Sequence, residues 1–211
     1  MNRYFDFNAT TPLLPEAREA WLRASERHWH NPSSLYRDAG IASQMLEAAR
    51  ERLAELLGVE AERIVFTSGA TEANNMLFAA FAGQRTAIST IEHPSVREAA
   101  RHWTCVSEFD AHGAMPEDAA LVSVMAANNE SGELLPWREL AACCREKSIP
   151  FHTDATQWIG KLATDFSGCD YVTGSAHKFG GPKGAGFLVL RDPDECIRLL
   201  RGGPQENGRR A

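Results

Sequence analysis

Two spacings of hydrophobic residues recur along this chain and predict different elements. Between residues 39 and 57 the apolar side chains fall on one face of a helix, which Gly58 is suited to end. Elsewhere, short apolar runs bounded by polar or glycine-rich residues predict buried strands. The helices expected from these patterns are residues 16–29, 39–57, 71–82, 96–103 and 135–147, and the strands are 64–67, 86–90, 105–109, 121–125, 151–153 and 171–172.

The order of these elements predicts an α/β fold. From residue 64 onwards short strands alternate with helices, which is the pattern of βαβ units and a mainly parallel sheet. Such a sheet binds its ligand in the loops at the carboxyl ends of its strands. Polar and ionisable residues gather at five of these junctions, namely Thr67-Ser68-Gly69-Ala70-Thr71-Glu72, Thr90-Ile91-Glu92-His93, Asn128-Asn129-Glu130, Asp154-Ala155-Thr156-Gln157 and Ser175-Ala176-His177-Lys178.

Composition limits the classes of protein that fit. The 211 residues are 44% hydrophobic and 24% charged, which is typical of a folded globular protein with a sizeable core. A formal net charge of −6 argues against a nucleic-acid-binding surface, and no apolar run is as long as a membrane span. The first residues show neither the basic nor the apolar region of a signal peptide, so we expect a cytoplasmic location. The five cysteines, without a CxxC pair, indicate neither a disulfide framework nor a metal site.

Two of the five junctions suggest how an anion and a carbonyl compound could be bound. Ser68-Gly69-Ala70-Thr71 opens a helix directly after a strand, so free backbone N–H groups and the helix dipole form an anion site there. A helix N-cap without a ligand is the alternative for this segment. Lys178 stands between an apolar strand and the glycine-rich residues 180–184, where desolvation would make its amine a nucleophile for carbonyl carbon. Most lysines, however, are exposed surface charges.

The other junctions carry an acid, an imidazole and two amides. Asp154 follows a strand where a carboxylate is buried, so it needs a partner, either a protonated pyridine nitrogen, a metal with further ligands or an arginine. His93 lies on a loop, where a histidine is often only structural. Asn129 and Gln157 can donate to a phenolate or a carboxylate, although loop amides usually bond to backbone.

Together these groups match the needs of one cofactor, pyridoxal 5′-phosphate (PLP). PLP requires a lysine for its Schiff base, an acid that keeps the pyridine nitrogen protonated, and an anchor for its phosphate. The combination, rather than any single residue, predicts a PLP-binding protein.

A series of motifs along the whole chain then identifies a family. These motifs are Asn8-Ala9-Thr10-Thr11-Pro12, Asn31-Pro32-Ser33-Ser34, Val65-Phe66-Thr67-Ser68-Gly69-Ala70-Thr71-Glu72, Glu92-His93, Asn128-Asn129-Glu130-Ser131-Gly132, His152-Thr153-Asp154-Ala155-Thr156-Gln157, Gly174-Ser175-Ala176-His177-Lys178, Gly180-Gly181-Pro182-Lys183-Gly184 and Gly202-Gly203-Pro204-Gln205-Glu206. In this order they closely resemble the cysteine desulfurases, the NifS/IscS-like members of the class V aminotransferase group of fold-type I PLP enzymes.

The resemblance implies a role for each site residue. Lys178 and His93 are the catalytic residues: Lys178 forms the covalent link to PLP, while His93 stacks on the ring and relays protons. Asp154 pairs with the pyridine nitrogen. Gln157 and Asn129 contact the phenolic oxygen, and Asn129 also reaches the substrate carboxylate. The phosphate is bound by the start of the helix and by the lysine loop, through Ala70, Thr71, Ser175 and His177.

The resemblance also implies the architecture. We expect a three-layer α/β/α fold around a mainly parallel, seven-stranded sheet, the large domain of fold-type I PLP-dependent transferases. This PLP-binding domain is expected at residues 15–211, after an extended segment, residues 1–14, that contributes to the small domain or the dimer contact in the family. A homodimer is the usual state of such enzymes, and the C-terminal small domain is expected to be absent from this chain.

The chain also departs from the family pattern. After residues 202–211 the family continues with a Gly-Thr pair, a loop with the sulfur-accepting cysteine and an arginine that binds the substrate carboxylate, and this sequence contains none of these. None of the five cysteines stands at the place of that loop in the family order. None of them therefore corresponds to the thiolate that is the nucleophile of the persulfide step in the family. The family converts L-cysteine to L-alanine and persulfide sulfur for iron-sulfur cluster or thio-cofactor assembly.

Two alternatives to a desulfurase stay open. The chain is a catalytically idle PLP-domain remnant that serves as a dimerisation or sulfur-transfer scaffold, or it is another class V aminotransferase or lyase with the same large-domain residues. The desulfurase hypothesis predicts L-cysteine or a related amino acid and a sulfur-acceptor scaffold protein as partners, and neither nucleic acid nor a membrane.

Overall fold

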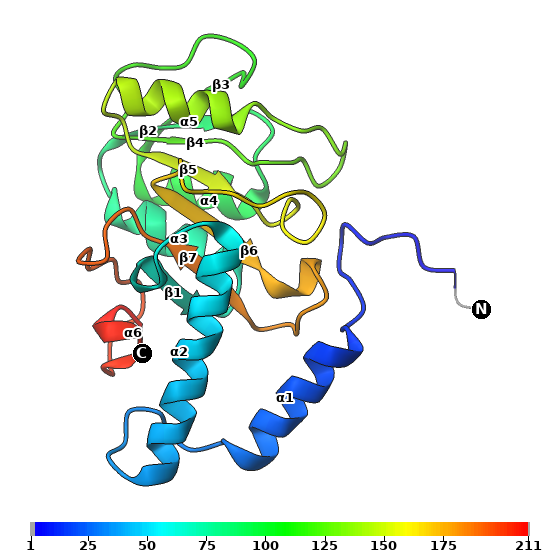
Figure 1. The fold of residues 1–211 in the computed structure, drawn as a ribbon. Coiled ribbons are helices and arrows are strands. Elements are labelled where there is room, and N and C mark those ends of the chain that lie inside the picture. The colour runs from blue at the N-terminus through cyan, green and yellow to red at the C-terminus, as the bar shows by residue number, and fades with distance from the viewer. Residues whose placement is uncertain (1–2, 211) are drawn as a thin grey trace.

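A computed structural model describes residues 3–210 and shows a twisted sheet covered by helices (Figure 1). Seven strands lie in the order β1-β7-β6-β5-β4-β2-β3. Strand β7 is antiparallel to its neighbours β1 and β6, and the other pairs are parallel, which confirms the mainly parallel, seven-stranded sheet. The strands are β1 (Ile64–Thr67), β2 (Arg85–Ser89), β3 (Cys105–Phe109), β4 (Leu121–Ser123), β5 (Phe151–Asp154), β6 (Tyr171–Ser175) and β7 (Gly186–Val189).

The five helices expected from the sequence are present, with shifted ends. The helices are α1 (Pro15–Arg27), α2 (Arg37–Leu57), α3 (Ala70–Ala80), α4 (Pro94–Trp103), α5 (Trp137–Glu146) and the short α6 (Gln205–Gly208), with 3₁₀ turns η1 (Ala61–Arg63) and η2 (Ala176–Lys178). Gly58 ends α2 in the left-handed conformation, with φ of 69°, as expected. Helix α5 begins two residues later than predicted, because Pro136 has a non-helical ψ of 50° and is the N-cap of the helix.

Both faces of the sheet are buried, because successive strand residues alternate between two cores. Val65 and Leu188 pack with α3 and α4 on one face, whereas Ile64 and Val189 pack with α2 and α5 on the other. Adjacent apolar residues in a strand therefore indicate the three-layer arrangement, whereas an apolar-polar alternation would indicate a sheet with one exposed face.

The pattern of the sequence did not predict strand β7. Its four residues begin with Gly186 and follow the glycine-rich residues 180–184, and no strand was predicted there. In the structure the main chain of β7 fills the space between β1 and β6, and its residues are buried.

The two ends of the described chain are attached to the sheet domain differently. Residues 3–14 contain neither helix nor strand, and they cross the lysine loop, where the N–H of Thr11 donates to the carbonyl of His177 at 2.8 Å. Helix α1 follows them and has no buried residue. Residues 1, 2 and 211, at the outer ends of the two segments expected from the sequence, lie outside the described residues. The division into these segments stays a prediction.

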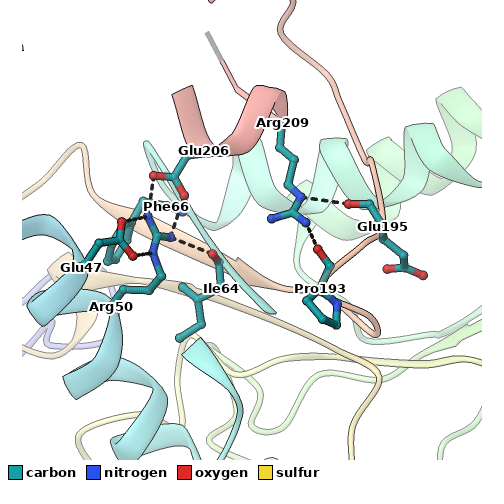
Figure 2. A network of polar contacts seen from close by, with 8 residues as sticks. All are labelled: Glu47, Arg50, Ile64, Phe66, Pro193, Glu195, Glu206 and Arg209. Carbon is teal, nitrogen blue, oxygen red and sulfur yellow. Dashed lines mark hydrogen bonds and ion pairs between the residues drawn. The ribbon is translucent and has the colours of Figure 1, made fainter. Parts of the chain in front are cut away.

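The C-terminal segment packs against α2 and β1 (Figures 1 and 2). Arg50 of α2 donates through both terminal nitrogens to the carboxylate of Glu206, at 2.7 and 3.0 Å, and to the carbonyl of Ile64 at 2.7 Å. Glu206 also accepts from the N–H of Phe66. Arg209 donates to the carbonyls of Pro193 and Glu195, so this segment is bound at two places.

Candidate active site

The residues expected from the sequence lie together at the carboxyl ends of the strands. They line a cavity of about 190 Å³ between the starts of α3 and α4, the end of β5 and the lysine turn η2. The cavity wall includes every residue expected to bind the cofactor, namely Ala70, Thr71, His93, Asn129, Asp154, Gln157, Ser175, His177 and Lys178. Their convergence is a structural finding, while the individual roles stay predictions.

The start of α3 forms one end of this cavity. The first N–H groups of a helix have no carbonyl partner within it, and here the N–H of Ala70 donates to Ser175 Oγ at 2.9 Å. Glu72 accepts from the N–H of Ser68 at 2.7 Å and from Arg210. Burial opposes ionisation of Glu72, but the hydrogen bonds from Arg210 and Ser68 hold its pKa below the usual value. The turn that precedes α3 is therefore closely fixed.

Lys178 is half-buried at the other side of the cavity. Its Nζ donates to the carbonyls of Asn8, at 2.5 Å, and Ala9, at 2.9 Å. Burial lowers the pKa of Lys178, and the negative charges of Asp154 and Asp6 oppose this shift. The amine therefore lies in the setting that favours its uncharged, nucleophilic form.

His177 precedes Lys178 and faces the same cavity. Burial and the charges of Lys178 and Lys183 lower the pKa of His177, and its Nδ1 lies 3.0 Å from Thr10 Oγ1. At neutral pH the imidazole is therefore uncharged and offers one N–H group.

Asp154 is buried at the end of β5 and is held by two donors. Its Oδ1 accepts from the N–H of Thr156 at 3.0 Å, and its Oδ2 accepts from Asn74 Nδ2 at 3.1 Å. Within residues 3–210 no arginine forms an ion pair with this carboxylate, and no three His, Cys, Asp or Glu side chains cluster as a metal site would require. Of the three partners considered from the sequence, the described residues supply neither the arginine nor the metal ligands.

His93 caps the start of α4. Its Nδ1 lies 3.1 Å from the N–H nitrogen of Ser95 and 2.8 Å from Ser95 Oγ, so the ring is fixed from one side. The ring forms part of the cavity wall.

The two amides are linked by the N-terminal segment. Gln157 Nε2 donates to the carbonyl of Asn8 at 2.8 Å, and Asn8 Nδ2 donates to the carbonyl of Asn129 at 3.1 Å. Lys161 Nζ donates to Gln157 Oε1 at 2.6 Å, which directs the amide's N–H groups towards Asn8. Residues 8 and 9 line a second pocket, which shares His93, Asn129 and Lys178 with the cavity.

The sequence analysis gave no role to some residues at the site. Ser95, Met125, Ala127 and Thr156 complete the cavity wall. Asn74 lies behind it and is fully buried in α3. The available signal was a polar residue on the apolar face of a predicted helix, between Ala73 and Met76, where a buried amide must have partners.

The site contains the groups that PLP requires. A helix start with Ser175 and His177 offers donors to a phosphate, Asp154 offers a carboxylate to a pyridine nitrogen, and Lys178 offers an amine to an aldehyde. Thr156 Oγ1 is buried in the cavity wall without a partner among the described residues. A polar ligand would satisfy this hydroxyl, so the residues present fit the cofactor.

A doubly covered α/β sheet with a half-buried lysine and a buried acid at its carboxyl edge is the architecture of fold-type I PLP-dependent proteins. The chain belongs to the aminotransferase class-V family, whose model matches residues 3–206. This family is PLP-dependent.

The most informative relatives are cysteine desulfurases. Cysteine desulfurase IscS of Dictyoglomus turgidum is 37% identical over 231 residues, which cover 99% of this chain and 59% of the relative. A cysteine desulfurase of Enterobacter agglomerans is 40% identical over 236 residues, which cover 100% of this chain and 58% of the relative. The chain therefore spans less than two thirds of the length of these relatives.

Solved structures show the same fold. A structure described as SspA in complex with cysteine matches with a TM-score of 0.91 and 32% identity, covering 99% of this chain and 67% of that one. A structure described as a NifS-like protein matches with a TM-score of 0.90 and 36% identity, covering 100% of this chain and 65% of that one. These matches confirm the expected fold class.

Proposed function

We propose that this chain is the PLP-binding part of a cysteine desulfurase. The observation that carries the proposal is the convergence of Lys178, Asp154 and the start of α3 on one cavity. The similarity to cysteine desulfurases over nearly the whole chain supports this assignment above the other class V reactions.

When bound, PLP supplies an electron sink that stabilises negative charge at the α-carbon of an amino acid. The residues of this chain would attach the cofactor and hold its ring and its phosphate in place. The amine of Lys178 supplies the covalent attachment, and the carboxylate of Asp154 is held by Asn74 and Thr156 for a pyridinium partner. His93 would cover the ring, and Ser175, His177 and Thr71 would bind the phosphate.

The proposed substrate is L-cysteine, which becomes L-alanine as its sulfur passes to a thiol and leaves a persulfide. We place the sulfur-accepting cysteine and the substrate-binding arginine in the part of the relatives that this chain does not span. The proposal includes a homodimer, a sulfur-acceptor scaffold protein as partner, a role in iron-sulfur cluster or thio-cofactor assembly, and a cytoplasmic location. Within residues 3–210 no helix has the length and apolar character needed to cross a membrane.

Cofactor attachment is tested by trapping. The chain is incubated with PLP, reduced with borohydride and digested, and the peptides are analysed by mass spectrometry. We expect a pyridoxyl group on Lys178, which is lost in Lys178→Ala. The matched control is Lys183→Ala, because Lys183 is an exposed lysine of the same loop and should leave the adduct unchanged. A folded chain without an adduct on Lys178 would contradict the proposal.

The reaction is tested by following the fate of cysteine. The PLP-loaded chain is incubated with L-cysteine and an added thiol, and alanine, sulfide and keto acids are measured. Alanine and sulfide release that Lys178→Ala abolishes supports the desulfurase. Keto-acid formation supports another class V enzyme.

A further inference from the structure

A buried chain of hydrogen bonds passes behind the cavity, and Asn74 is its centre. Asn74 lies on α3 and has an exposed fraction of 0%. Its Nδ2 donates to Asp154 Oδ2 at 3.1 Å and to Ser95 Oγ at 2.9 Å, and its Oδ1 accepts from Thr173 Oγ1 at 2.8 Å. All the hydrogen-bonding groups of this amide except one lone pair are therefore in use.

The carboxylate of Asp154 determines which group donates and which accepts in each of these hydrogen bonds. A carboxylate only accepts, so the amide must direct its NH₂ group towards Asp154 and its oxygen towards Thr173. The second hydrogen of the NH₂ group then points to Ser95 Oγ. Ser95 Oγ accepts from Asn74, so its own hydrogen is available for His93 Nδ1 at 2.8 Å.

These directions assign the tautomer of His93. Nδ1 accepts from the hydroxyl of Ser95 and, at 3.1 Å, from its backbone N–H. A neutral imidazole carries one hydrogen, which must then be on Nε2. Within residues 3–210 Nε2 has no protein partner, and the ring lines the cavity, so this N–H is available to a ligand.

The other end of the chain of bonds agrees with this assignment. Thr173 donates to Asn74, so it must accept from His152 Nε2, and His152 Nδ1 then accepts from Ser123 Oγ at 2.8 Å. Burial lowers the pKa of His152 to about 4, which leaves the neutral imidazole that this pattern requires. Every hydrogen bond from Ser123 to His93 can therefore form at once, with one donor and one acceptor in each.

We propose that Asn74 is a positioning residue that sets two groups of the site together. It orients the carboxylate of Asp154 and directs the hydroxyl of Ser95 to His93 Nδ1. That hydroxyl and the backbone N–H of Ser95 together hold His93 as the tautomer with its hydrogen on Nε2. His93 consequently presents a hydrogen-bond donor, rather than a base, to a newly bound ligand. This inference deepens the proposed function and rests on it for the identity of the ligand, but the tautomer itself is a property of the chain without PLP.

The tautomer is measured by NMR correlation of the histidine ring nitrogens and carbon-bound protons in the PLP-free chain. The pH is kept above the ordinary imidazole pKa of about 6.5, and His93→Gln assigns the signals. We expect a protonated Nε2 and an unprotonated Nδ1 in His93. A His93 ring with its hydrogen on Nδ1 overturns the proposal whatever the variants show.

The role of Asn74 is tested by Asn74→Asp, which should redirect the hydroxyl of Ser95. A carboxylate at this position accepts from that hydroxyl, so His93 Nδ1 keeps only the backbone N–H of Ser95 as a donor. The loss of one donor should shift the Nδ1 resonance of His93 and reduce the fraction of the Nε2–H tautomer. The matched control is Asn75→Asp on the same helix, because within residues 3–210 the Asn75 amide donates only to the carbonyl of Thr71. It should leave the His93 signals in place. An unchanged Nδ1 resonance of His93 in folded Asn74→Asp contradicts the proposal.

A second variant avoids the added charge. Asn74→Ala removes the donor to Asp154 and should weaken PLP binding roughly tenfold, as expected for one hydrogen bond to a charged group. Asn75→Ala should change the affinity less than about twofold. Equal affinities for the two alanine variants contradict the positioning role. If PLP fails to attach to Lys178 at all, the proposed function fails, and the tautomer result still stands by itself.

Discussion

At the scale of single residues, Glu92 stands out because it is a buried acid that no cation neutralises in the described residues. It has an exposed fraction of 3%, and its Oε1 accepts from Ser89 Oγ at 2.5 Å and from the N–H of Met125 at 2.7 Å. Its Oε2 has no partner among those residues. Burial raises the pKa of Glu92 to about 8, and the charge of Asp154 adds to the shift. Glu92 is therefore protonated at neutral pH.

This raised pKa makes stability fall as pH rises. The unfolded chain ionises Glu92 near its ordinary value, whereas the folded chain keeps the proton up to about pH 8. Between these values the folded state binds more protons, so the free energy of unfolding decreases by up to about 1.4 kcal/mol per pH unit. Glu92→Gln keeps the acceptor oxygen and removes the titration.

We therefore expect Glu92→Gln to be more stable than the parent chain at pH 8, by about 2 kcal/mol or more, and to gain much less at pH 5. Urea denaturation at the two pH values measures this. Glu130→Gln, at an exposed glutamate after β4, is the control and should follow the parent at both. The same gain at pH 5 and pH 8 would show that Glu92 is ionised in the folded protein.

At the scale of elements, β7 and the turn before α3 depend on the close approach of two glycines. A side chain at Gly186 would place its Cβ 2.4 Å from the Cα of Gly69 and 2.7 Å from the carbonyl oxygen of Gly174. Both neighbours are backbone atoms, so neither can rotate away. The glycine at the start of β7 therefore sets the distance between this strand and the turn before α3.

Gly186→Ala should destabilise the fold by about 3 kcal/mol or more, because it overpacks backbone against backbone, and it should weaken PLP binding because the turn is displaced. The control is Gly40→Ala in α2, which meets no atom within 4 Å and should stabilise the helix by up to about 1 kcal/mol. Urea denaturation and PLP titration measure the two effects. A neutral Gly186→Ala would show that the strands can separate at low cost.

At the scale of the whole molecule, a few ion pairs bind the C-terminal segment to the sheet domain. Glu206 and Asn207 have φ values of 51° and 57°, which is unfavourable for residues with side chains. The two hydrogen bonds from Arg50 to Glu206 offset this strain (Figure 2), and Arg210 extends the attachment to Glu72 at the start of α3. The C-terminal segment thereby contacts the helix that borders the cavity.

Removal of the Glu206 carboxylate should therefore lower the free energy of unfolding more than removal of Glu47, the other carboxylate that pairs with Arg50. The side chains of Arg50 and Glu206 are each 9% exposed, whereas that of Glu47 is 56% exposed. We expect Glu206→Ala to destabilise the chain by about 3 kcal/mol, as for a broken buried pair, and to speed tryptic cleavage after Arg209. Glu47→Ala should cost less than about 1 kcal/mol. Equal losses for the two variants, by thermal or urea unfolding, would mean that Arg50 is not held by Glu206.

Local patterns in the sequence determined most of the elements and most of the cavity. Strand and helix periodicities depend on neighbouring residues, and parallel strands bring their carboxyl ends together, so His93, Asp154 and Lys178 could be expected at one edge from the order of elements alone. The motifs around them were sufficient to identify the family. Strand β7 was not predicted, because a short segment that begins with glycine resembles a loop.

Only the tertiary structure decided which polar groups meet behind the cavity. Asn74 and Asp154 are 80 residues apart in the chain, and Arg50 and Glu206 are 156 apart, so no local spacing relates them. Their pairing follows from the packing of α3 on the sheet and of the C-terminal segment on α2. Once burial removes water, each donor needs an acceptor, and this requirement determines the orientation of Asn74 and the tautomer of His93.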